Sequence, residues 1–276
     1  MKKLDRLGWA AGISFKSYGA RIGIRVNDLA AFEHLLDYMP PAWKPSSSPI
    51  VDDLFSLIVG GTTLGDRVRR YNLLYWSSER LARTMDLDEV LETLESSLHF
   101  SVALRARRRL FVHAGVVSWR GRAIVIPGLS SSGKTTLVEA LVRAGGTYYS
   151  DEYAVFDTSG RVYPYAKPLS IKGKLDERPK KCVVEGLDRL GFKPLPVGLV
   201  VVTEYKPNAR WRPRVLSPGK ALLALLDNTV LARVRSKFAL KTLQRAVSSA
   251  IALKGKRGEA QNVVPSLLKR LEESIG

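Results

Sequence analysis

Apolar and polar residues alternate along two short segments near the start of the chain, residues 13–18 and 21–26. A period of two is typical of strands that bury one face, so both segments are predicted as strands. The pair Tyr18-Gly19 lies between them, and a glycine-containing pair at that place favours a tight turn. The chain is therefore expected to open with an antiparallel hairpin.

Helices and further strands are predicted after this hairpin. A helix should begin at Asn27, whose side chain can cap it, and bury an apolar face of Leu29, Phe32 and Leu36. Residues 54–59 and 71–76 have strand-like patterns. A long helix should then begin at Asp86 or Asp88 and bury one face, formed by Leu87, Val90, Leu91, Leu94 and Leu98.

Short strands and glycine turns dominate the rest of the chain. Strands are predicted at residues 110–113, 116–119, 123–126, 147–150, 153–156 and 161–165. The near-continuous apolar run 197–202 is typical of a strand that is buried on both faces. Helices are expected at residues 217–233, 237–248 and 260–274, with a last strand at 251–257. This change of pattern predicts two domains, a smaller α+β domain over residues 1–107 and an α/β domain over residues 108–276.

Composition excludes several classes of protein. With 276 residues, 45% of them apolar, the chain is long enough to bury a core and is not a low-complexity sequence. Its apolar runs are far shorter than the roughly 20 residues of a membrane helix, and no signal-type apolar core follows the first residues. We therefore expect a soluble cytoplasmic protein without a membrane partner. A single cysteine, Cys182, excludes an internal disulfide, and three histidines without a cysteine cluster give no zinc site.

The charge is strongly positive and unevenly distributed. The chain has 44 basic and 26 acidic side chains, a net charge of +18. The first 100 residues hold 12 basic and 13 acidic side chains, so the whole excess lies in the remainder. Such a field attracts phosphates, nucleic acids or acidic protein surfaces without specifying which.

A glycine-rich loop in the basic part of the chain has the sequence pattern of a phosphate-binding loop. Residues 128–135 match the pattern G-x-x-x-x-G-K-[ST], between a predicted strand and a predicted helix. Glycines allow consecutive backbone N–H groups to converge on phosphate oxygens at a helix N-terminus. In this interpretation Lys134 supplies a charge for the β- and γ-phosphates of ATP, and the Thr135 hydroxyl binds Mg²⁺. The predicted nucleotide-binding residues are Gly128, Leu129, Ser130, Ser131, Ser132, Gly133, Lys134, Thr135 and Thr136.

Two carboxylates follow this loop after a short interval. Only 15 residues separate Thr135 from the pair Asp151-Glu152, so one helix and one strand lead directly to it. In most nucleotide-hydrolysing proteins with such a loop the metal-binding Asp ends a later apolar strand, but the run 197–202 here ends without an aspartate. Asp151 is predicted to act as general base or metal ligand and Glu152 as metal or positioning ligand, with Lys134 stabilising the transferred group. The arrangement favours phosphoryl transfer to a hydroxyl.

The same segments resemble a known family. His113-Ala114-Gly115-Val116-Val117, a short hairpin, the glycine-rich loop and Ser150-Asp151-Glu152, in this order and spacing, look like the catalytic domain of HPr serine kinase/phosphorylase, which shares its core with phosphoenolpyruvate carboxykinases. The resemblance covers about residues 108–260. It implies an α/β fold with a phosphoenolpyruvate-carboxykinase-like P-loop kinase core, and ATP and Mg²⁺ as cofactors. It also implies catalytic roles for His113, Asp151 and Glu152.

Some positions depart from the family pattern. Thr136 stands where the family usually has a metal-associated Glu, and Glu152 replaces the usual second Asp. The first hundred residues have no evident counterpart in the family. The segment from Pro218 to Asn228 resembles the family's late basic segment, which lies near the phosphate or the protein substrate.

Two classes of function remain from the sequence. One is an ATP-dependent kinase acting on a hydroxyl of a protein, peptide or small molecule, and the other is a non-catalytic nucleotide-binding module or a nucleic-acid-associated NTPase. Trp211 lies among Arg210, Arg212 and Arg214, a composition found in single-strand binders, although a cation–π surface hairpin is the favoured interpretation. We favour the kinase and expect no nucleic-acid partner, and self-association into a homo-oligomer stays open. His34 and His99 are expected to have surface or packing roles only, and Cys182, with no partner base in the sequence, is expected to have no catalytic role.

Overall fold

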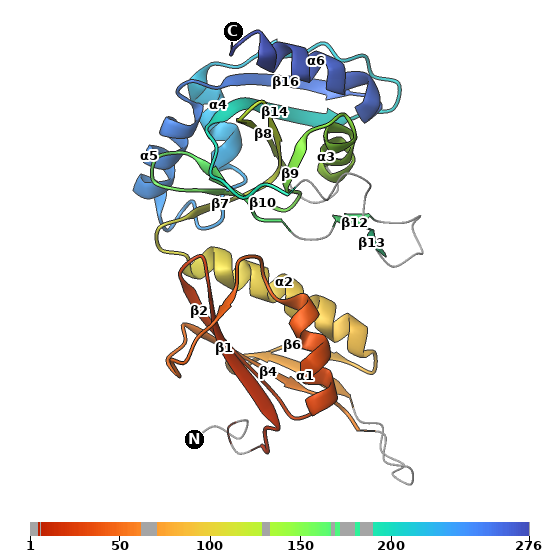
Figure 1. Cartoon of the computed structure of the whole chain (residues 1–276), viewed down its shortest axis with the longest axis vertical. Helices are drawn as coiled ribbons and strands as arrows, with labels where there is room; N and C mark the ends of the chain where they lie inside the picture. The colour runs from red at the N-terminus through yellow and green to blue at the C-terminus, as the bar shows by residue number, and fades with distance from the viewer. Residues whose placement is uncertain are drawn as a thin grey trace. The chain divides into compact units, whose positions relative to one another are not determined.

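The protein divides into two compact units, Met1–Arg107 and Arg108–Gly276 (Figure 1). The computed structural model describes residues 5, 7–61, 71–128, 133–166, 169–171, 180–182 and 190–275. Both units combine helices with a mixed sheet that contains parallel and antiparallel pairs.

The first unit is built on a six-stranded sheet in the order β3-β1-β2-β4-β5-β6. Its strands are β1 (Ala11–Ser17), β2 (Ala20–Val26), β3 (Lys44–Pro45), β4 (Asp53–Ile58), β5 (Asn72–Trp76) and β6 (Glu79–Thr84). All neighbours pair antiparallel except β2 and β4, which run parallel. Its helices are α1 (Leu29–Leu35), the short 3₁₀ helix η2 (Leu36–Tyr38) and α2 (Leu87–Arg105), which contacts β2, β5 and β6.

The predicted hairpin is confirmed, but the details of α1 were predicted wrongly. Tyr18 and Gly19 have φ of 49° and 89°, which suits the tight turn between β1 and β2. The helix is capped by Asp28, because the side chain of Asn27 instead binds both backbone polar groups of Val59. The prediction of its buried apolar face was also wrong, because Leu29 is 64% exposed. The buried residues of this seven-residue helix are Ala31 and Leu35.

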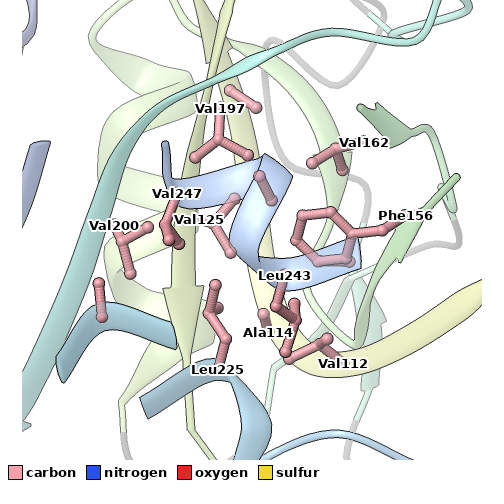
Figure 2. Packing of buried hydrophobic residues seen from close by; sticks show 14 of the residues in the cluster. Val112, Ala114, Val125, Phe156, Val162, Val197, Val200, Leu225, Leu243 and Val247 are labelled. Atoms are coloured by element: carbon pink, nitrogen blue, oxygen red, sulfur yellow. The ribbon is translucent and has the colours of Figure 1, made fainter. Parts of the chain in front are cut away.

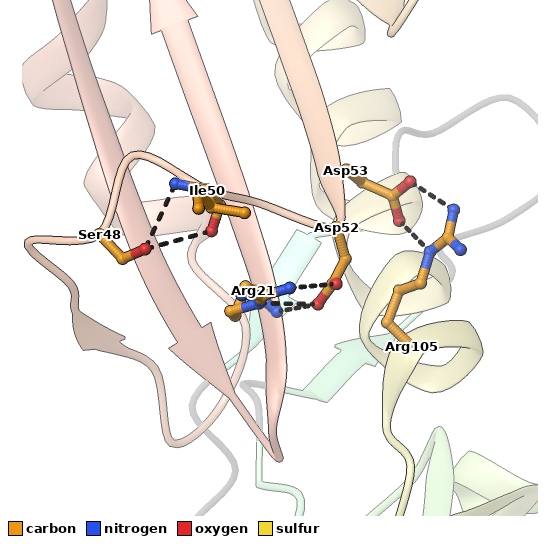
Figure 3. Close-up of polar contacts among 6 residues, drawn as sticks. All are labelled: Arg21, Ser48, Ile50, Asp52, Asp53 and Arg105. Carbon is orange, nitrogen blue, oxygen red and sulfur yellow. Dashed lines mark hydrogen bonds and ion pairs between the residues drawn. The ribbon is translucent and has the colours of Figure 1, made fainter.

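Two neighbouring aspartates at the start of β4 bind arginines from different elements (Figure 3). Asp52 pairs with Arg21 at 2.9 Å in a partly buried contact. Asp53 is 4% exposed and accepts hydrogen bonds from Ser101 at 2.7 Å and from Arg105 Nε and Nη2 at 2.8 and 2.7 Å. Burial alone would raise the pKa of Asp53, but the hydrogen bonds from Arg105 and Ser101 outweigh it and hold the pKa below its ordinary value. This ion pair, whose carboxylate is buried, ties β4 to the last two turns of α2.

Removing Arg105 should destabilise the first unit, because it leaves the buried Asp53 carboxylate without its cation. Arg105→Met is expected to lower the free energy of unfolding by about 2–3 kcal/mol at neutral pH, measured by urea denaturation. Arg21→Met is the matched control and should cost less, since the Asp52 side chain is 18% exposed and that of Asp53 only 3%.

The pH dependence of stability tests whether the loss in Arg105→Met comes from the charge of Asp53. In the wild type the contribution of Asp53 is present above the ordinary pKa of an aspartate and is lost as the pH falls through the lowered folded pKa. The loss in Arg105→Met should therefore shrink below about pH 4, where the unpaired carboxyl is protonated. A loss that stays constant between pH 3 and pH 7 would contradict this role of the pair.

The second unit is built on an eight-stranded sheet in the order β11-β10-β7-β8-β14-β16-β15, with β9 also paired to β7. Its strands are β7 (Leu110–Trp119), β8 (Arg122–Pro127), β9 (Thr147–Ser150), β10 (Tyr153–Phe156), β11 (Val162–Tyr163), β14 (Val197–Tyr205), β15 (Arg214–Val215) and β16 (Ile251–Arg257). The central strands β8, β14 and β16 run parallel to one another. Strands β12 (Leu169–Ile171) and β13 (Lys180–Cys182) form a separate antiparallel pair.

Helices cover both faces of this sheet because successive residues of its central strands point to opposite sides. Ile124 of β8 packs with α3 (Lys134–Arg143) and α6 (Ala260–Glu272) in one apolar cluster. Val125, the next residue, packs with α4 (Pro218–Leu226) and α5 (Ser236–Val247) in the other cluster. Figure 2 shows this second cluster, which includes Val125 of β8, Phe156 of β10 and Leu243 of α5. Among the described residues, no helix is both long and apolar enough to cross a membrane.

Three sequence predictions for this unit can be compared with the structure. Residues 110–119 form one continuous strand and not two, and Gly115 in its middle lets α3 approach, since a Cβ there would lie 2.5 Å from Val138 Cγ2. The helix expected to reach residue 233 ends at Leu226, after which the backbone returns to bond with β7 at His113. The last strand at 251–257 is confirmed.

Candidate functional site

The candidate site lies where the central parallel strands end. Parallel strands have their carboxyl ends at the same edge of a sheet, so β8, β14 and β16 all end at one edge. Strand β8 leads into Gly128, and α3 begins at Lys134. Of the predicted phosphate loop, Leu129, Ser130, Ser131 and Ser132 lie outside the described residues.

The two ends of the loop are fixed by backbone geometry. The N–H of Gly128 donates to the carbonyl of His113 at 3.1 Å, which ties the loop to β7. Gly133 precedes α3 with φ of 79°, in the left-handed region that favours glycine. It provides no side chain to cap the helix, so the N-terminus of α3 keeps backbone N–H groups for another acceptor. That geometry suits a bound anion.

Lys134 is half-buried in the first turn of α3. Burial lowers the pKa of its amine, and the negative charges of Asp151 and Glu152 oppose that shift. Both carboxylates therefore lie close enough to Lys134 to act on its charge. The structure brings together these three predicted residues from two separate segments.

The acidic pair lies in the bend between β9 and β10. Ser150 shapes this bend, because its buried hydroxyl accepts the backbone N–H groups of Glu152 at 3.1 Å and Tyr153 at 3.0 Å. The hydroxyl of Tyr148, which is fully buried, donates to Asp151 Oδ1 at 2.9 Å. Burial and the charge of Asp151 raise the pKa of Tyr148 far above its ordinary value, so its hydroxyl stays a donor.

His113 lies on β7 directly opposite Tyr153 of β10. Its ring is half-buried against the Tyr153 ring, with 4.6 Å between centroids. Burial lowers the pKa of the imidazole, Lys134 lowers it further, and Glu152 opposes both. The ring is therefore neutral near pH 7 and can accept a proton or a hydrogen bond.

The oxygen donors near the loop fit Mg²⁺. Among the described residues, no group of three or more His, Cys, Asp or Glu side chains could hold a metal ion by itself. Two carboxylates and the hydroxyl of Thr135 are hard oxygen donors, and Mg²⁺ is commonly held by one or two carboxylates together with phosphate oxygens and waters. Thr136 is exposed and lines a groove between α3 and α6.

Sequence reasoning missed Tyr148 and Arg257. Tyr148 looked like one more apolar residue of a strand, and Arg257 like the end of the last strand. Arg257 Nη2 donates to the Gly133 carbonyl at 2.7 Å, across 124 residues of sequence. The one available signal was position, since a basic residue that ends a strand parallel to β8 lies at the same edge as the loop.

The residues discounted from the sequence lie elsewhere. His34 is exposed on α1 and His99 is buried in α2, both in the first unit. The structure describes only the backbone of Cys182. The surface-hairpin interpretation of Trp211 was wrong, because its half-buried ring packs against the apolar cluster of α3 and α6 and beside Gly255 of β16.

Comparisons with known proteins identify no family. No family model and no curated protein sequence matches this chain. One similar solved structure is the HPr(Ser) kinase/phosphatase from Coxiella burnetii, with 13% sequence identity and a TM-score of 0.34, covering 60% of this chain and 97% of that one. At this TM-score the likeness carries no argument about function, so the function has to be inferred from the site residues themselves.

The hydrogen bond of Tyr148 to Asp151 should be measurable in stability. Tyr148→Phe is expected to lower the free energy of unfolding by about 2 kcal/mol, because hydrogen bonds to charged groups contribute roughly 1.5–3 kcal/mol. Tyr149→Phe is the matched control, since Tyr149 on the same strand donates to the neutral carbonyl of Lys193 at 2.9 Å. Its loss should be about 1 kcal/mol. Equal losses in urea denaturation would contradict a charge-assisted contact at Asp151.

Proposed function

We propose that this chain is an ATP-dependent phosphotransferase, which moves the γ-phosphoryl group to a hydroxyl of a protein, a peptide or a small molecule. The observation that carries the proposal is the shared electrostatic environment of Lys134, Asp151 and Glu152 at the N-terminus of α3. A phosphate site alone would serve a binding module equally well. Two carboxylates beside it supply the metal-binding and proton-accepting groups that transfer needs. The proposed fold of the second unit is that of a phosphoenolpyruvate-carboxykinase-like P-loop kinase core.

The residues at the start of α3 would bind the nucleotide. Gly133 provides no side chain to cap α3, so backbone N–H groups in the first turn of the helix stay open toward phosphate oxygens. Lys134 would contact the β- and γ-phosphates, and its half-buried amine makes that contact stronger than it would be in water. Mg²⁺, when bound, would neutralise phosphate charge, and Thr135 with the acidic pair would hold it.

Asp151 would act as the general base. The acceptor oxygen forms a bond to the γ-phosphorus, the bond from that phosphorus to the β–γ bridging oxygen breaks, and ADP leaves. The proton of the acceptor hydroxyl passes to Asp151. Tyr148 supports this role by holding Oδ1 in one orientation through its hydrogen bond.

Glu152 and His113 would complete the site. Glu152 is assigned to metal binding or positioning, with its backbone fixed by Ser150 and by the bond from the Ala114 N–H to its carbonyl at 3.1 Å. His113 is assigned to the transfer site as a neutral imidazole, which can orient the acceptor hydroxyl without adding charge.

Nucleotide binding should depend on Lys134. Lys134→Ala is expected to weaken ATP binding at least about tenfold in titration calorimetry with Mg²⁺, because a charge facing the phosphates is lost. Arg143→Ala is the matched control, since it removes an exposed cation from the same helix. Unchanged affinity in Lys134→Ala would overturn the phosphate site.

Transfer should depend on Asp151 more than on Glu152. Asp151→Asn should keep ATP affinity within a few-fold and reduce phosphoryl transfer to an acceptor by about 10² to 10⁴. Glu152→Gln should be milder and partly rescued by raised Mg²⁺. Wild-type transfer by Asp151→Asn together with its loss in Glu152→Gln would exchange the two roles. ATP binding without any transfer, combined with polyanion binding that weakens steeply with salt, would favour the binding-module function instead.

A further inference from the structure

Arg257 is a buried cation at the edge of the sheet that holds the loop. It is the last residue of β16 and only 1% exposed. Its Nη2 donates to the Gly133 carbonyl at 2.7 Å, and its Nη1 donates to the Gly258 carbonyl at 3.0 Å. The guanidinium carbon lies 5.6 Å from the centre of the Tyr205 ring. The Nε atom is buried and has no hydrogen-bond partner among the described residues.

Within the part of the chain that the structure describes, the charge of Arg257 has no close counter-ion, because both of its hydrogen bonds go to neutral carbonyl oxygens. Burial lowers the pKa of the guanidinium, and Glu259 and Tyr205 oppose the shift. The carboxylate of Glu259 accepts a hydrogen bond from the Tyr205 hydroxyl at 3.0 Å. A buried charge without a pair is costly, so its presence calls for a compensating ligand.

The guanidinium is aimed at the N-terminus of α3. A Cβ at Gly133 would lie 2.6 Å from Arg257 Nη2, so only a glycine leaves room for this contact. The Gly133 carbonyl is also the acceptor for the Leu137 N–H in the first turn of α3, at 3.3 Å. Arg257 therefore fixes the peptide group that orients this turn. The cations of Arg257 and Lys134 thus lie at the N-terminus of α3, which is also the positive end of the helix dipole.

We infer that Arg257 is a phosphate-positioning residue. It holds Gly133 in the left-handed conformation that directs the first N–H groups of α3 toward a polyphosphate, and it adds positive charge that the polyphosphate neutralises. The inference rests on the proposed nucleotide site and extends it to a residue 123 positions beyond Lys134 in the sequence. It also implies that the ligand-free protein carries an electrostatic cost at this edge, which binding relieves.

The test compares Arg257→Met, which removes the charge, with Arg257→Lys, which keeps the charge and loses the two-pronged geometry. Arg270→Met is the control, because it removes an exposed cation of α6 and leaves the loop untouched. Affinity for ATP and for inorganic tripolyphosphate is measured by titration calorimetry, and the Tm of each full-length variant is measured without ligand. We expect Arg257→Met to bind both probes at least about tenfold more weakly, Arg257→Lys to be intermediate, and the ligand-free Tm of Arg257→Met to be no lower than that of the wild type.

The outcomes separate this inference from the proposed function. Unchanged affinity in both Arg257 variants, with binding by the wild type intact, overturns the inference alone. A lower ligand-free Tm in Arg257→Met with wild-type affinity also overturns it, because that pattern marks a purely structural arginine. If Arg257→Met does not fold, Arg257→Lys decides by weakened or unchanged affinity. No binding of either probe by the wild type overturns the proposed function and this inference with it.

Discussion

Strands β8, β14 and β16 run parallel, and this register brings three chain segments to one edge of the sheet. Parallel strands are covered on both faces, and here the alternation of Ile124 and Val125 sends successive side chains into two apolar clusters. The helices that fill those clusters include α3, whose N-terminus is thereby held at the same edge. The candidate site depends on this arrangement, because the pairing of these strands joins segments that are far apart in the sequence.

Positive and negative charges meet at this edge of the sheet, and hydrogen bonds fix the position of the acidic pair. Lys134, Arg257 and the helix dipole all contribute positive potential, while Asp151 and Glu152 contribute negative charge beside it. Ser150 and Tyr148 supply the hydrogen bonds that fix the acidic pair in place. The site thus holds charges of both signs before any ligand is present, which is the preorganisation that the proposed phosphoryl transfer would require.

The sequence predicted the features whose signals are local. The turn at Tyr18-Gly19 follows from the conformation of two residues, and the buried strand at 197–202 from an unbroken apolar run. The face of α1 was mispredicted because seven residues are too few for a clear period. The edge strand β6 was missed, since three of its six residues are charged and no apolar face marks it. The contact of Arg257 with Gly133 spans 124 residues and has no local signal.

Each of the two units has its own buried apolar core and its own buried charge. In the first unit Asp53 is matched by Arg105 in an ion pair with good geometry, which is what a purely structural buried charge requires. In the second unit Arg257 is as deeply buried, but among the residues that the structure describes it meets only carbonyls and a ring at close range. The contrast between these two buried charges in one chain is consistent with the proposal that the second unit binds an anion. The net charge of +18 follows the same division, since its excess lies beyond the first 100 residues.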